Sequence, residues 1–173
     1  MVLSASHTIM AKIKYIHNIN ITQKYEEVNM SDLSDSMKVV LSTVFTLYLK
    51  AHRYHWNVEG SNFSEYHKFF GKVYENIWKS VDDIAEQIRA LGEYAPGSFA
   101  EFHAFSEIED ETENPPAQQM FSILILDNQK VIETLNKAFI LAQKESNQGL
   151  MNFLADRLDS HAKLGWMLKS FMK

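Results

Sequence analysis

Two histidines and two carboxylates in the central part of the chain have the residue types and spacing of a metal site. His55 and His67 flank a short Gly60-Ser61-Asn62 turn, so their imidazoles can approach one point. Asp82 and Glu86 are four residues apart, which places both carboxylates on one face of a helix. Nitrogen and carboxylate ligands with open positions suit Fe(II) or Mn(II), and they also hold Zn(II).

The helix expected to carry His67 also carries Asp82, and its length separates the two side chains. They are 15 positions apart, so at ~1.5 Å of rise per residue they stand ~22 Å apart and cannot bind one ion within one chain. At ~100° per residue, Asp82 and Glu86 fall roughly opposite the apolar stripe of this helix. We therefore expect a two-fold interface, with antiparallel copies of the helix, to build two identical sites from both chains. Trp78 lies near the same outward face, as an interface aromatic would.

Other interpretations of these residues stay open at the level of sequence. An outward Asp-x-x-x-Glu pair is also what a solvated helix face contains. His52 continues the stripe from Tyr48, which favours a core or hydrogen-bonding histidine over a ligand. His161 lies on the apolar stripe of the last helix, which indicates a structural role. The sequence contains no Glu-x-x-His, the motif that holds two metals inside a single bundle.

Four long amphipathic helices are expected to position these residues, because apolar residues recur at three- and four-residue spacing between turn and capping residues. The expected helices run from Ser31 to about Asn57, from an Asn62 or Ser64 cap to a Gly92 stop, from Pro115-Pro116 to about Lys144, and onward from a Ser146 or Asn147 cap. A short capped helix is expected at 98–105. Two helical hairpins joined by a long crossover predict an all-α, ferritin-like four-helix bundle.

Composition and domain organisation agree with a single helical domain. Residues 1–30 have no clean periodicity, so we expect a poorly ordered arm followed by one bundle domain at 31–173. Hydrophobic residues make up 46% of the 173 residues, which suffices for one sizeable core. The absence of cysteine excludes thiolate metal sites and thiol catalysis. No apolar run approaches the ~20 residues of a membrane helix, and the N-terminal segment does not resemble a secretory signal, which together predict a cytoplasmic protein.

A long, gapped motif surrounds the candidate ligands. It consists of His55-Trp56-Asn57-Val58-Glu59-Gly60-Ser61-Asn62-Phe63, then His67, then the run from Asp82 to Gly92. This motif closely resembles that of the Dps family of mini-ferritins. The resemblance covers about residues 40–100, and the last two expected helices fit the family in length and order.

The resemblance implies a hollow homo-dodecameric shell with ferroxidase sites at its two-fold interfaces. Fe(II) would be oxidised there by hydrogen peroxide or oxygen, and ferric mineral would collect in the cavity. The resemblance assigns His55 and His67 as ligands from one subunit, and Asp82 and Glu86 as ligands from its neighbour, with Zn or Mn as substitutes for iron. Trp56 occupies the family's tryptophan beside the site, where it would trap oxidising equivalents.

The sequence departs from the family at Gly71. The family often has an acidic ligand at this position, four residues after the second histidine, so we expect weaker binding of a second iron. DNA is the family's second partner, usually bound by lysine-rich tails. With a net charge of −5, this sequence predicts weak DNA binding, and a DNA-compacting shell with weakened ferroxidase activity is the alternative function. Asp156 and Asp159 are candidates for an acidic pore that admits iron.

Overall fold

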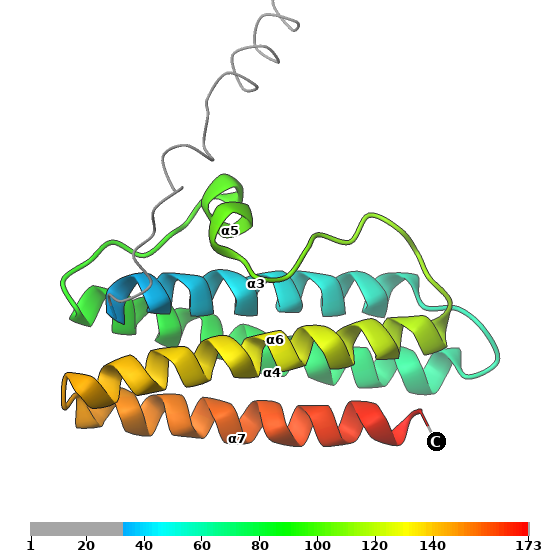
Figure 1. Cartoon of the computed structure of the whole chain (residues 1–173). Coiled ribbons are helices and arrows are strands. Elements are labelled where there is room, and N and C mark those ends of the chain that lie inside the picture. Colours follow the sequence, from blue (N-terminus) through cyan, green and yellow to red (C-terminus); the bar gives the residue numbers. More distant parts are fainter. Residues whose placement is uncertain (1–32, 173) are drawn as a thin grey trace, which may run out of the picture.

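The computed structural model describes residues 33–172, which form five α-helices and no strand. The helices are α3 (Leu33–Asn57), α4 (Phe63–Ala90), α5 (Phe99–Phe105), α6 (Ala117–Lys144) and α7 (Gln148–Ser170). Four long helices lie side by side, and the short α5 rests against α3 (Figure 1). The expected four-helix bundle, with a short helix in its long crossover, is confirmed. None of the helices within this part of the chain is long and apolar enough to cross a membrane.

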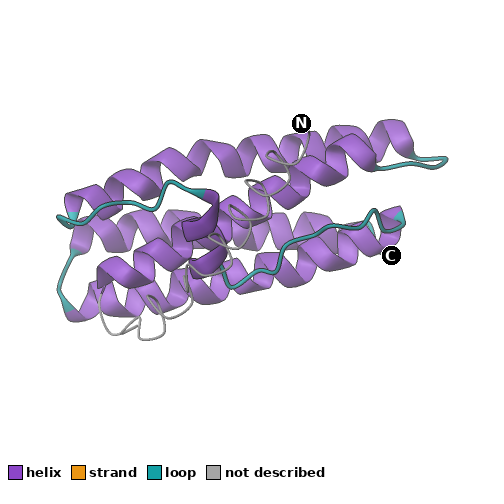
Figure 2. Cartoon of the chain, turned by 90° about the horizontal axis from the view of Figure 1, so that it is seen from above, coloured by secondary structure: helices purple, strands orange, loops and turns teal. Residues whose placement is uncertain are grey.

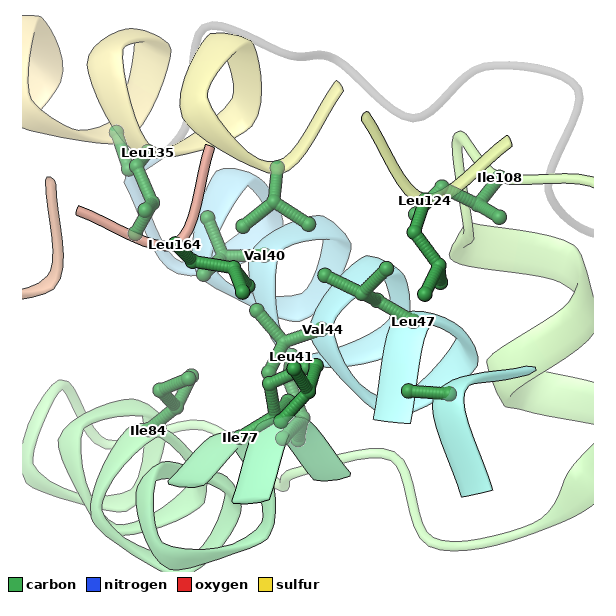
Figure 3. Packing of buried hydrophobic residues seen from close by; sticks show 14 of the residues in the cluster. Val40, Leu41, Val44, Leu47, Ile77, Ile84, Ile108, Leu124, Leu135 and Leu164 are labelled. Atoms are coloured by element: carbon green, nitrogen blue, oxygen red, sulfur yellow. The ribbon is translucent and has the colours of Figure 1, made fainter. Parts of the chain in front are cut away.

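The core follows from the apolar stripes of the helices. Helix α3 is the central element, because it packs against α4, α5 and α6, while α7 packs mainly against α6. Its stripe residues Val40, Leu41 and Val44 are buried. Figure 3 shows them facing residues of α4, α6 and α7. Seen from above, the turns lie at the two ends of the bundle and the long connection runs over its surface (Figure 2).

The helix ends largely follow the expected signals. Gly92 has φ +92° just after α4, a conformation that favours glycine, and its N–H donates to the Arg89 carbonyl. Ser98 and Glu101 form a capping box at the start of α5. Asn147 caps α7 through the Leu150 N–H.

The start of α4 differs from the expectation in one respect. Asn62 occupies the N-cap position, but its side chain caps no backbone N–H. Its amide instead donates to the Tyr66 hydroxyl at 3.0 Å. The expected cap at Ser31 and the expected arm at 1–30 lie outside the described residues.

Polar contacts fasten the long connection to the second half of α3. The Arg53 guanidinium donates to the Thr112 carbonyl at 2.8 Å and to the Asn114 side chain at 3.1 Å. The adjacent Tyr54 hydroxyl is buried and donates to Glu111 at 3.0 Å. Burial, that hydrogen bond and nearby carboxylates raise the pKa of Tyr54, so it stays protonated. These contacts hold the end of α3 that carries His55.

A buried hydrogen-bonded pair joins α6 to α7. Asn128 and His161 are 2% and 4% exposed. The Asn128 amide donates to the His161 carbonyl at 2.9 Å, and the His161 Nδ1 lies 2.8 Å from the Asn128 amide oxygen. Because an amide oxygen only accepts, His161 donates from Nδ1. The structural role expected for His161 is confirmed.

We predict that His161 makes the fold sensitive to acid. Burial, followed by the nearby Arg157 charge, lowers the pKa of His161 from 6.5 to about 4. Between these pH values the unfolded chain binds a proton that the folded chain excludes. The free energy of unfolding should therefore fall as pH falls from 6.5 towards 4, by about 3 kcal/mol per subunit.

Chemical denaturation at several pH values checks this prediction. A His161→Gln variant should lose this part of the pH dependence, whereas a variant of the exposed His103, His103→Gln, should keep it. Parallel pH profiles for the wild type and His161→Gln would contradict the assignment.

Candidate metal centre

The α3–α4 turn brings the two predicted histidine ligands together. His55 lies in the last turn of α3 and His67 in the second turn of α4. Their rings stack with centroids 3.8 Å apart and planes inclined by 23°. Both residues are half-buried. The sequence-based expectation that these imidazoles approach one another is confirmed.

Reciprocal hydrogen bonds fix which nitrogen of each ring is available. The Nδ1 of His55 lies 2.7 Å from the His67 carbonyl, and the Nδ1 of His67 lies 2.8 Å from the His55 carbonyl. A carbonyl can only accept, so each Nδ1 carries the proton and donates it. In the neutral rings the lone pair is then on Nε2, which is the atom free to bind a metal.

Gly71 lies directly against the His55 ring. A Cβ atom at this position would stand 3.3 Å from both Nδ1 and Cε1 of His55. That separation is tighter than ordinary van der Waals contact, so any larger residue would press on the ring. From the sequence, Gly71 was interpreted only as a lost acidic ligand. The structure adds that its missing side chain makes room for the histidine.

The predicted carboxylate ligands stand apart from the histidines. Asp82 and Glu86 are both exposed on α4, on the face turned away from the core. Neither has an ion-pair or hydrogen-bond partner within residues 33–172. In the same part of the chain, no three His, Asp or Glu side chains gather closely enough to hold a metal ion. The histidine pair and the carboxylate pair are therefore separate within the described residues, and the ligand roles of all four residues stay predictions.

Aromatic side chains surround the histidine pair. The Tyr74 ring meets His55 edge-on at 5.2 Å and stacks on His52 at 3.9 Å. His52 also contacts Trp56 at 4.0 Å, and Trp56 is 61% exposed. Burial and then the His55 charge lower the pKa of His52. Tyr74 follows His67 by seven residues, a spacing of about two turns that places both on one face of α4.

The structure also places the other residues that the sequence analysis named. Asp156 and Asp159 are exposed on α7, and their role in a pore stays a prediction. His52 makes a hydrogen bond to Tyr48 at 3.2 Å, which confirms the expectation of a hydrogen-bonding histidine. Trp78 is 52% exposed, and its place in an interface stays a prediction.

Comparison with known proteins places this fold and this motif in one family. Residues 36–173 match the model of the ferritin-like domain. A low temperature-induced protein of Nostoc sp. is 30% identical over 162 residues, which cover 90% of this chain and 86% of the relative. The DNA protection during starvation protein of Helicobacter pylori is 26% identical over 79% of this chain and 95% of its own length.

A solved structure agrees with these relatives. The crystal structure of Dps from Staphylococcus aureus superposes with a TM-score of 0.78 and 26% identity, covering 82% of this chain and 95% of that chain. The chain therefore belongs to the Dps family of ferritin-like proteins.

We predict that Gly71→Ala gains less stability than a matched substitution elsewhere. Replacing glycine by alanine within a helix stabilises it by up to about 1 kcal/mol. At Gly149, the added Cβ would lie 3.9 Å from its nearest neighbour, an ordinary contact. At Gly71, pressure on the His55 ring should offset the gain. Denaturation of both variants measures the difference, and an equal gain at the two positions would contradict the close approach.

Proposed function

We propose that this protein oxidises Fe(II) at sites shared between two copies of the chain and stores the ferric product. The observation that carries the proposal is the histidine pair, in which hydrogen bonds occupy both Nδ1 atoms and leave both Nε2 atoms free. Such pre-ordered imidazoles bind a divalent metal without first losing rotamer freedom. Iron is the substrate here, and Zn or Mn are expected to substitute for it.

Helix geometry supports a site that two chains share. The straight run of α4 keeps Asp82 ~22 Å and Glu86 ~28 Å from His67, and both carboxylates are exposed and free of partners within the described residues. In our proposal, a second copy packs against α4 in the antiparallel sense and brings its carboxylates to the histidines. The two-fold axis then creates two equivalent sites, each with nitrogen and oxygen ligands.

Each residue has a defined role in the proposed reaction. His55 and His67 hold iron through Nε2, while Asp82 and Glu86 of the second copy add negative charge that stabilises Fe(III) over Fe(II). Hydrogen peroxide, or oxygen, accepts the electrons. Trp56 lies beside the site, where it takes up oxidising equivalents that escape. The ferric product collects inside a homo-dodecameric shell.

The net charge favours iron over DNA as the main partner. A chain of charge −5, repeated in a shell, repels the phosphate backbone and attracts cations. The name of the Helicobacter pylori relative points to DNA protection. In our proposal, that protection is chemical, because the iron which would otherwise react with peroxide is removed.

Mixing two inactive variants tests the shared site. His55→Ala keeps Asp82 and Glu86, and Asp82→Ala keeps both histidines. Each variant alone should lose most peroxide-driven Fe(II) oxidation, because every site lacks one ligand. In a mixed two-fold pair, one site carries both defects and the other is complete. Co-assembled shells should therefore regain activity in proportion to the fraction of mixed pairs.

Stopped-flow absorbance of ferric product measures the activity, and native mass spectrometry verifies the mixing. The neighbouring exposed carboxylate supplies a matched control, because Asp83→Ala should leave oxidation unchanged. Circular dichroism checks that His55→Ala keeps its helices after losing one hydrogen bond to α4. Verified mixing without any recovered activity would reject the shared site.

A further inference from the structure

A groove runs along the seam between α4 and α7. Helix α4 packs mainly against α3, and α7 packs mainly against α6, so α4 and α7 are not pressed together along their whole length. At one end of the seam the Phe69 and Phe171 rings are in contact, with centroids 4.5 Å apart. Beyond this contact the groove has a volume of about 430 Å³. Small-molecule sites typically have volumes of ~300–1,000 Å³, so the groove is large enough to hold a small ligand.

The floor of the groove is apolar. Val73 of α4 and Leu164 of α7 lie at the bottom, where they are 4% and 7% exposed. The half-buried side chains of Phe69 and Met167 extend this surface along the two helices. Their spacing of three or four residues on each helix places one stripe of α4 opposite one stripe of α7. Water gains few hydrogen bonds from such a floor, so its displacement by an apolar group is favourable.

Two lysines give the groove a positive charge. Lys72 of α4 and Lys163 of α7 line it from opposite sides. Both lysines are exposed, and neither has an ion-pair or hydrogen-bond partner within residues 33–172. Among the described residues that line the groove, none is acidic. In a chain whose net charge is −5, the groove is therefore a local site that attracts anions.

The register of the two helices sets the size of the ligand. Helices α4 and α7 run antiparallel (Figure 1), and the contact between Phe69 and Phe171 fixes their register. With this register, Lys72 and Lys163 differ by about five residues along the groove, or ~8 Å. Lysine has a flexible four-carbon stem, so both ammonium groups can reach one anionic head. From Phe69 to Asn76 the groove extends ~10 Å along α4, which is close to the length of an extended octyl chain.

We propose that this groove binds a medium-chain alkyl carboxylate, with octanoate as the representative ligand. The alkyl chain covers the apolar floor, and the carboxylate pairs with Lys72 and Lys163. Each buried methylene group raises the affinity by up to about fourfold, and each exposed ion pair raises it by up to about fivefold. None of the candidate metal ligands lines the groove, so this binding goes beyond the proposed iron chemistry and does not depend on it.

Isothermal titration calorimetry of the full-length protein tests the inference. Octanoate should bind with a negative change in heat capacity, and hexanoate, which lacks two methylene groups, should bind about tenfold more weakly. Octanol lacks the charge and acetate lacks the chain, so both should bind more weakly than octanoate. Lys72→Met and Lys163→Met keep most of the alkyl stem but lose the charge, and each should lower the affinity about threefold to fivefold. Lys79→Met is the matched control, because Lys79 is exposed on α4 but lies outside the groove.

A second variant blocks the groove without removing a charge. Asn76 is exposed and lines the groove, so Asn76→Trp should cover the floor and abolish octanoate binding. Native mass spectrometry checks that each variant keeps the assembly of the wild type and counts the bound octanoate. Equal affinity for octanol and octanoate, or an equal loss in Lys79→Met and Lys72→Met, would overturn the inference. A wild type that binds no octanoate would also overturn it, and altered assembly of Asn76→Trp would then assign the groove to a second copy of the chain.

Discussion

The two hydrogen bonds that His55 and His67 exchange across the α3–α4 turn are the interaction on which the rest of the site depends. The His55 carbonyl is one of the last four of α3, which have no partner inside their own helix. The ring of His67 supplies that partner. Each such bond contributes about 1 kcal/mol to the fold. Their larger effect is on the rings themselves, because they determine the tautomer, the ring orientation and the nitrogen that is left without a hydrogen bond.

Helix α4 imposes the second constraint, which is rigidity. A regular helix cannot fold back within the span from His67 to Asp82, so the fold that orders the histidines also keeps the carboxylates away from them. Polar contacts also anchor the second half of α3. The buried Lys50 ammonium pairs with Asp127 of α6 at 2.7 Å, and Arg53 ties the same stretch of α3 to the long connection. The end of α3 is therefore fastened to both α6 and the long connection, and in our proposal another chain completes the site.

The sequence predicted the fold, the proximity of the two histidines and the outward direction of the carboxylates, because all three depend on local periodicity and on one short turn. Stripe residues such as Val40 and Ile84 are fully buried, as their spacing indicates, and the outward direction of Asp82 follows from helix rotation alone. Asn62 shows where local signals fail. The residue type suits a cap, but a hydroxyl one turn ahead, on Tyr66, competes for its side chain.

Contacts between helices could not be predicted from the sequence, because they depend on the register and the rotation of α3 relative to α4. The stacking of Tyr74 on His52 is of this kind. The two residues belong to different helices, so their contact depends on the register of α3 against α4. The reciprocal bonds between His55 and His67 also needed the structure, because the sequence predicts proximity but not which atoms meet.

Gly71 links these observations, because its missing Cβ lets the His55 ring lie against α4 and reach the His67 carbonyl. A larger side chain at this position would press on the ring, so a carboxylate there and the observed position of His55 compete for the same space. In our proposal, the sequence gives up a possible ligand at residue 71 and retains a well-ordered imidazole in its place.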